Sequence, residues 1–133
     1  MRITILLACA AFSGPAIAQT WMLVDGGEWA PDAAAENDVV RSVETAFLQA
    51  AHDGSEDVPP WSTYTIQYQG RVVNGLRVIE ISGACGEIAQ QMMRTYDLKK
   101  MFVGVSDGGP CVFRATYDMN IRRLVSFRFN GVA

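Results

Sequence analysis

Apolar and polar residues alternate most clearly between residues 64 and 85, where the pattern predicts a β-hairpin. Asn74-Gly75 lies between two runs rich in β-branched and aromatic residues, and it favours a two-residue turn because both turn positions need positive φ. With this turn Val73 pairs with Leu76, and the register follows outward. One face then collects Tyr64, Ile66, Tyr68, Val72, Ile79, Ile81 and Cys85, and the other collects Thr65, Gln67, Gln69, Arg71, Glu80 and Ser82. The separation predicts a half-buried hairpin.

Helical spacing of apolar residues predicts two helices. Pro31-Asp32 suits the start of the first, main helix, and Gly54 is expected to end it as a left-handed cap. Its buried stripe consists of Val39, Val43, Ala46, Phe47 and Ala50. The second, shorter helix is predicted for residues 86–96, where Ile88, Met92 and Tyr96 are four apart.

Further strands are predicted on both sides of this region. Residues 19–24 form a short first strand, and residues 101–105 are compatible with another. Residues 111–117 and 125–129 alternate again and predict a C-terminal hairpin. The expected fold is α+β, with one main helix packed on an antiparallel sheet of about four to five strands.

The first residues of the chain resemble a secretory signal peptide. Met1-Arg2 is a short positive start, residues 3–12 are apolar, and Ala16-Ile17-Ala18 is a small-x-small cleavage site. We therefore expect cleavage after Ala18, and a single small domain over residues 19–133 that is periplasmic or secreted. Lipidation of Cys9 is the alternative, but it leaves an apolar region shorter than the usual ~7–15 residues. The run is also far below the ~20 residues of a membrane span, and none is expected.

The cysteines that remain after cleavage predict one disulfide. Cys85 and Cys111 form an even pair in an exported domain, where disulfides persist. Cys85 ends one predicted strand and Cys111 begins another, so their bridge would join the two hairpins. The pair lacks the Cys-x-x-Cys spacing of redox enzymes, and His52 is the only histidine. No metal site or cofactor is expected.

The charge pattern limits the choice of partners. The net charge is −3, which argues against a nucleic-acid binder. Acidic residues are concentrated in residues 19–57, whereas residues 58–133 carry most of the bases. The two parts either attract each other within the fold, or the basic part meets an anionic partner.

Residues 52–55, His-Asp-Gly-Ser, bring the residue types of a catalytic triad together. Adjacent residues rarely face one another, and triads are assembled from distant segments, so this stretch is read as the polar end of a helix. No catalytic residue is assigned, and a non-enzymatic protein is favoured. The alternative is a small-ligand-binding or enzymatic domain whose helix and curved sheet enclose an internal pocket.

The polar side of the predicted sheet is a candidate binding surface. It would present Gln67, Gln69, Arg71, Arg114, Arg128 and Asn130 away from the main helix. If Tyr117 pairs with Val125, Arg114 lies directly opposite Arg128, and like charges in that position cost stability. Such a pair is tolerated if Glu80 lies beside it or if an anionic partner docks there.

The order of elements over residues 36–131 is similar to that of cystatin-like domains, in which an antiparallel sheet cradles a helix. Residues 71–75, Arg-Val-Val-Asn-Gly, resemble the first hairpin loop of cystatin protease inhibitors, Gln-x-Val-x-Gly. Val73 and Gly75 match, and Arg71 stands at the glutamine position. The resemblance implies that Val73 and Gly75 enter a protease cleft. It implies neither the second helix nor the disulfide.

Together these patterns predict a non-catalytic binding or inhibitor-type module. Its candidate binding residues are Arg71, Val73, Gly75, Arg114 and Arg128. The expected partner is an envelope or extracellular protein or an anionic ligand. The sequence leaves the partner's identity and the oligomeric state open.

Overall fold

A computed structural model of the chain describes residues 19–54 and 57–131. The predicted signal peptide and Cys9 lie outside the described residues. One five-stranded sheet has the order β2-β3-β4-β5-β6. Its strands are β2 (Thr20–Leu23), β3 (Tyr64–Val73), β4 (Leu76–Cys85), β5 (Val112–Asp118) and β6 (Arg123–Phe129). The α+β class is confirmed.

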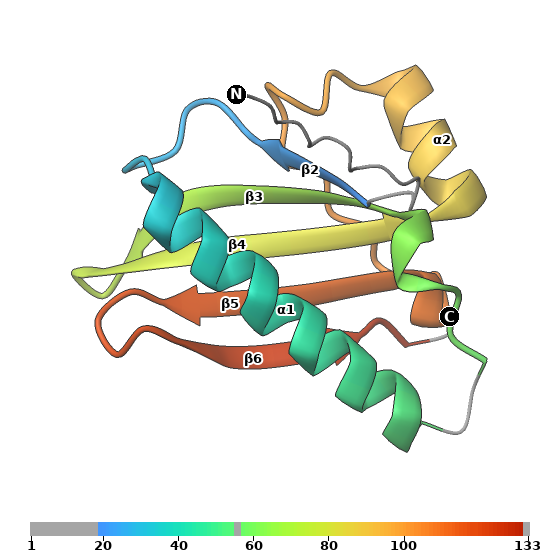
Figure 1. Cartoon of the computed structure of the whole chain (residues 1–133). Helices are drawn as coiled ribbons and strands as arrows, with labels where there is room; N and C mark the ends of the chain where they lie inside the picture. The colour runs from blue at the N-terminus through green and yellow to red at the C-terminus, as the bar shows by residue number, and fades with distance from the viewer. Residues whose placement is uncertain (1–18, 55–56, 132–133) are drawn as a thin grey trace, which may run out of the picture.

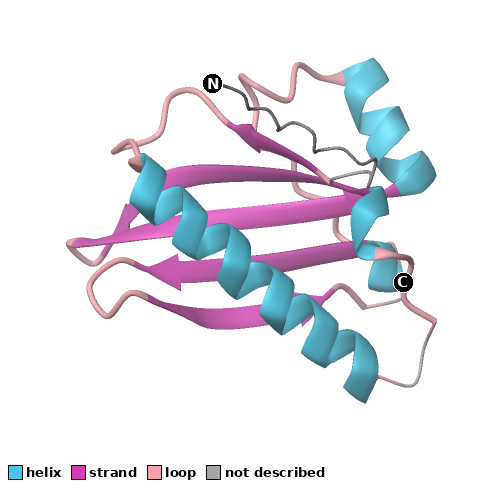
Figure 2. Cartoon of the chain, in the orientation of Figure 1, coloured by secondary structure: helices cyan, strands magenta, loops and turns pink. Residues whose placement is uncertain are grey.

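Two helices pack on the sheet. The main helix, α1 (Ala33–Asp53), crosses one face diagonally, and we call this face the inner face (Figure 1). The short helix α2 (Gly86–Thr95) packs on the opposite, outer face. The loop between α2 and β5 passes behind the sheet in the view of Figure 2. No helix among residues 19–54 and 57–131 is both long and apolar enough to cross a membrane.

The predicted hairpin is confirmed with its register. Val73 pairs with Leu76, and the antiparallel ladder continues to Tyr64 and Cys85. Asn74 has φ 52° and Gly75 has φ 79°, the positive values that a tight two-residue turn between these strands requires.

The sheet is mixed rather than wholly antiparallel, because β2 pairs with β3 in parallel. The chain leaves β2, passes through α1 and returns to the neighbouring position at the same end of the sheet. A connection of that length allows parallel pairing, which a short turn does not.

Two further predictions were wrong. Residues 101–105 form no strand. The side chain of Gln67 holds this part of the chain instead. Its amide donates to the carbonyl oxygens of Leu98 and Met101, and its Oε1 accepts from the N–H of Val103. Gly54 is extended, with φ −77°, and it closes α1 by donating its N–H to the carbonyl of Ala50.

The inner core is built around Phe47. Asp32 caps α1 by accepting the N–H of Ala35 at 2.8 Å, and the helix buries Ala35, Val39, Val43 and Phe47. The ring of Phe47 contacts five other aromatic rings at centroid distances of 4.8–6.4 Å, those of Trp61, Tyr64, Phe113, Phe127 and Phe129. These rings fill the space between the helix and the sheet, where the alternative interpretation placed an internal pocket.

A second, smaller core covers part of the outer face. It consists of Ala84, Ala89, Met92, Leu98 and Val112, so α2 and the loop after it cover the ends of β4 and β5 that lie nearest the disulfide. Gln67, which we expected on an exposed polar face, is only 1% exposed beneath this cover. Beyond this cover, Glu80, Arg114 and Thr116 of the outer face are only partly buried.

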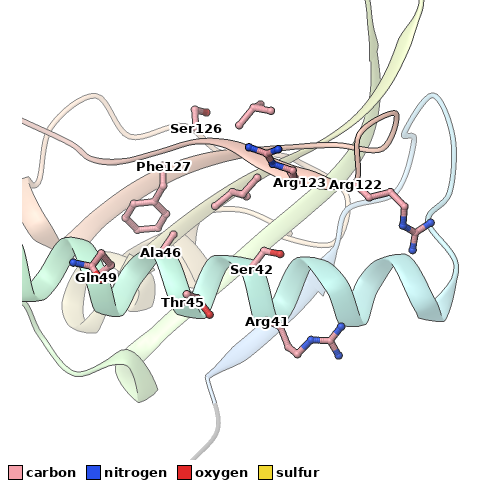
Figure 3. Close-up of a pocket in the computed structure, with 11 residues that line it drawn as sticks. Arg41, Ser42, Thr45, Ala46, Gln49, Arg122, Arg123, Ser126 and Phe127 are labelled. Carbon is pink, nitrogen blue, oxygen red and sulfur yellow. The ribbon is translucent and has the colours of Figure 1, made fainter.

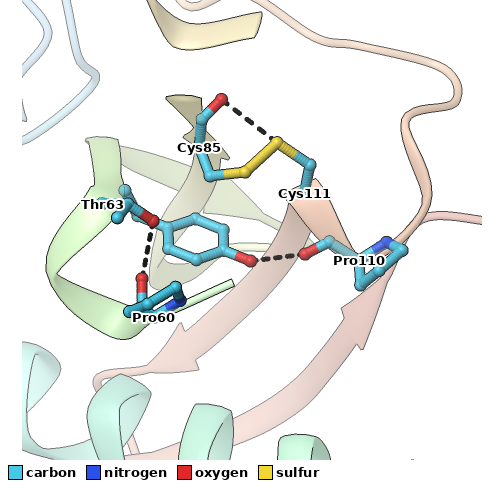
Figure 4. Close-up of a disulfide and its surroundings, with 6 residues drawn as sticks. Pro60, Thr63, Cys85, Pro110 and Cys111 are labelled. Carbon is cyan, nitrogen blue, oxygen red and sulfur yellow. Dashed lines mark hydrogen bonds between the residues drawn. A yellow bond between two sulfur atoms is a disulfide. The ribbon is translucent and has the colours of Figure 1, made fainter. Parts of the chain in front are cut away.

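The predicted disulfide between Cys85 and Cys111 is present, with a Cα–Cα distance of 5.1 Å (Figure 4). It lies one position beyond Ala84–Val112, the last pair of the β4–β5 ladder. The hydroxyl of Tyr64 donates to the carbonyl of Pro110 beside it, and burial raises the pKa of that hydroxyl. The bridge therefore closes a loop that holds α2 and the cover of the outer face.

Candidate binding surfaces

The five candidate binding residues occupy two separate places. Arg71, Val73 and Gly75 lie at the closed end of the β3–β4 hairpin. Arg114 and Arg128 lie opposite each other on β5 and β6. Arg71 is level with Asp118 across β4, four residues along β5 from Arg114, which puts the two places roughly 16 Å apart.

Arg71 already has a counter-charge at the hairpin end. Its Nε lies 3.3 Å from Oε1 of Glu28, and the same oxygen accepts the N–H of Val72 at 2.9 Å. The bond from Val72, followed by that from Arg71, lowers the pKa of Glu28. This arrangement ties the hairpin to the loop that precedes α1.

The tip of the same hairpin is apolar and exposed. Val72, Val73 and Leu76 have exposed fractions of 41%, 46% and 42%. Val73 and Leu76 are a cross-strand pair on one face of the hairpin and Val72 lies on the other, so the tip exposes aliphatic side chains on both faces.

Arg114 and Arg128 belong to a polar hollow that we call the arginine patch. It consists of Glu80, Arg114, Thr116, Ser126 and Arg128 and encloses about 250 Å³. Thr116 donates its hydroxyl to Glu80 at 3.0 Å. Among the residues that the structure describes, neither arginine forms an ion pair. Glu80 thus lies beside the Arg114–Arg128 pair, which was one of the two expected ways to tolerate the like charges. Its hydrogen bond, however, is with Thr116 and not with either arginine.

The expected register next to the patch was wrong by one residue. Tyr117 pairs with Leu124, not with Val125, because the register shifts between Thr116 and Tyr117. Val125 is the unopposed residue, and its side chain is 52% exposed. Such a bulge lets Leu124 pack toward the core while the Arg114–Arg128 pair is kept.

A groove between α1 and β6 was not predicted from the sequence. It has a volume of about 720 Å³. Arg41 of α1, Arg122 of the turn before β6 and Arg123, the first residue of β6, lie along it (Figure 3). Asp38 pairs with Arg41 at 2.7 Å and with Arg122 at 2.8 Å. We call this hollow the edge groove. No short motif marks it, because its residues come from a helix surface and a turn.

Two ion pairs explain part of the uneven charge distribution. Arg122 with Asp38 and Arg71 with Glu28 both join the acidic first part of the chain to the basic second part. This supports attraction within the fold for those four residues. Arg114, Arg123 and Arg128 are among the described cations that these ion pairs do not include.

The triad-like stretch is an exposed helix end. The imidazole of His52 lies 3.5 Å from the carboxylate of Asp53, and both side chains are largely in solvent. Ser55 lies outside the described residues. Within residues 19–54 and 57–131, no group of three histidine, cysteine or carboxylate side chains is placed to hold a metal ion.

Comparison of the chain with protein-family models, with curated proteins and with solved structures finds no significant match.

Proposed function

We propose that this chain is an exported, non-catalytic binding module that holds an anionic group of an envelope or extracellular partner in the arginine patch. The observation that carries the proposal is the direct opposition of Arg114 and Arg128 across two strands, with no carboxylate paired to either among the described residues.

The cost of this arrangement supports a role in binding. Like charges directly opposite each other in a sheet destabilise it by an amount of the order of the 0.2–1 kcal/mol found for cross-strand pairs. Sequences break such local rules mainly at functional sites. A carboxylate or phosphate between the two guanidinium groups would reverse the repulsion, because each group can donate two parallel hydrogen bonds.

The surroundings of the patch suit a small anionic group. Thr116 and Ser126 add hydroxyls beside the guanidinium groups, and the hollow of about 250 Å³ is below the usual size of a pocket for a drug-sized ligand. The guanidinium of Arg114 lies close to the loop at Gly104. The patch therefore fits an acidic side chain, a chain terminus or a phosphate presented by a larger partner.

Arg128→Ala tests this proposal by thermal unfolding. In sodium chloride the variant should be more stable than the natural domain by about 0.2–1 kcal/mol, because the repulsion is gone. In phosphate of equal ionic strength the natural domain should gain several degrees in Tm, and the variant should gain less than half of that. Arg94→Ala, on the exposed surface of α2, should respond to phosphate as the natural domain does. Equal phosphate responses of the natural domain and Arg128→Ala would refute the patch as an anion site.

The apolar hairpin tip favours a second candidate function, inhibition of a protease. The resemblance to the cystatin loop implies that Val73 and Gly75 enter a protease cleft, and under this proposal the exposed side chains of Val72 and Leu76 enter with them. The exposure of the Val72, Val73 and Leu76 side chains supports this second function. Burial in a cleft would remove their apolar surface from water, which is energetically favourable.

Inhibition assays against purified cysteine, serine and metalloproteases test the tip. We expect the domain comprising residues 19–133 to inhibit one class and Val73→Asp to weaken inhibition by roughly tenfold or more, because a charge would have to be buried in the cleft. Leu48→Asp is the matched control, since Leu48 is 53% exposed on α1. If no class is inhibited, or if both variants act alike, the tip is not an inhibitory wedge.

A further inference from the structure

The β6 strand has backbone groups that face an open edge of the sheet. β6 is the last strand in the sheet order, and Asn130 donates its N–H to the carbonyl of Val112 at 2.8 Å. Hydrogen-bonded and non-hydrogen-bonded pairs alternate along an antiparallel ladder, so Arg114–Arg128 is also a bonded pair. The N–H and C=O of Phe127 therefore point away from β5. Such a row is a template for an additional strand.

The edge groove lies along this open edge. Its apolar lining residues are Leu124 and Phe127 of β6 and Ala46 of α1. Ser42, Thr45 and Gln49 of α1 line it as well (Figure 3). An extended chain added to β6 would thus have main-chain partners on one side and helix side chains on the other. This is the arrangement in which a peptide augments a sheet and places alternate side chains in a groove.

The charge of the groove selects its occupant. Arg41, Arg122 and Arg123 line the groove, and no acidic side chain is among its lining residues. Asp38 pairs with both Arg41 and Arg122. Arg123 is opposite Asp118 of β5 in the sheet, but it forms no ion pair within the described part of the chain. Pairing with β6 of a second copy would bring these arginines together, whereas an acidic strand would neutralise them.

We infer that the edge groove binds an extended acidic segment of a partner protein as an additional strand, antiparallel to β6. Antiparallel pairing is slightly more stable per residue than parallel pairing, and β6 already uses it with β5. In this direction the C-terminal end of the bound segment lies beside Arg122 and Arg123, at the start of β6. The acidic residues belong at that end. The groove lies between α1 and β6, and Ser126 is the one residue that lines both the groove and the arginine patch.

Two end-blocked peptides of equal composition test the inference, Thr-Val-Thr-Val-Asp-Asp and Asp-Asp-Val-Thr-Val-Thr. Fluorescence anisotropy should show the first binding roughly tenfold more tightly than the second, because only the first brings its carboxylates to the arginines. Amide exchange of Phe127 should slow when the first peptide binds. Equal affinities, no binding, or an unchanged exchange rate at Phe127 would overturn the inference.

Two further changes distinguish the addition of a strand from simple charge attraction: methylation of the peptide's backbone nitrogens, and a substitution that fills the groove. Two methylated forms of the first peptide are compared, one with N-methyl groups at its odd positions and one at its even positions. Only every second N–H of an added strand faces β6, so one form should lose binding and the other should keep it. Thr45→Trp, which fills the groove, should weaken binding at least roughly tenfold. Leu48→Trp, at an exposed position of α1 outside the groove, should not. Equal effects of the two methylation patterns, or of the two tryptophan variants, would contradict strand addition.

A second copy as occupant would give a different result. Sedimentation would then show a dimer, with Phe127 protected from exchange in the absence of peptide, and the proposed acidic partner would be wrong. The phosphate measurement on Arg128→Ala uses neither the peptides nor the groove. Either proposal can therefore fail while the other stands.

Discussion

Phe47→Ala should lower the free energy of unfolding by about 3–5 kcal/mol, the usual cost of deleting a buried aromatic ring. Phe47 is 2% exposed and lies among the rings of Trp61, Tyr64, Phe113, Phe127 and Phe129. These neighbours come from residues 61–64, from β5 and from β6, so no single movement can refill the space. The loss is a large share of the ~5–15 kcal/mol by which domains are stable.

Urea unfolding followed by tryptophan fluorescence measures this loss, because Trp61 contacts the deleted ring. Leu48→Ala is the matched control, since the neighbouring residue on α1 is 53% exposed and should change stability by no more than about 0.5 kcal/mol. Similar midpoints for the two variants would show that α1 does not pack on the sheet as described.

Removal of the disulfide is expected to have the next largest effect. The bridge joins residues 26 apart in sequence, and closing a loop of that length restricts the unfolded chain by about 3 kcal/mol in the chain-entropy account. The closed loop contains α2 and the segment bonded to Gln67, so the outer cover should loosen first. The paired change Cys85→Ala with Cys111→Ala avoids placing a hydroxyl at Cys85, which is 5% exposed.

Unfolding of the oxidised natural domain and of the double alanine variant gives the comparison. Amide exchange should rise most in α2 and in residues 97–108, and less in the β3–β4 ladder. Equal stability, or exchange that rises uniformly over the sheet, would mean that the bridge does not restrain this part of the fold.

The sequence was most informative where structure is local. Asn74-Gly75 specified the turn, and the period of two then determined the partner of every residue from Tyr64 to Cys85. The same reasoning placed Arg114 opposite Arg128, although the bulge at Val125 shifted the neighbouring pair. Both successes depend on residues close in the chain or joined by a short connection.

The errors concern interactions between distant segments. β2 has only four residues, and its parallel pairing depends on where α1 returns the chain. Gln67 follows the polar alternation of its strand, and nothing in that alternation shows that residues 98–103 bury it. The edge groove depends on the angle between α1 and β6, which no local pattern encodes. The candidate site was therefore only partly predictable.

The three bonds of Gln67 have a consequence for how this domain can vary. All three partners are main-chain atoms, the carbonyls of Leu98 and Met101 and the N–H of Val103. The anchor therefore places no demand on the side chains of the segment it holds, and Lys99, Lys100 and Met101 are exposed. A chain that keeps this glutamine could therefore carry other side chains at positions 99–101 without a change in the rest of the fold. These positions would suit natural sequence variation or the grafting of a peptide.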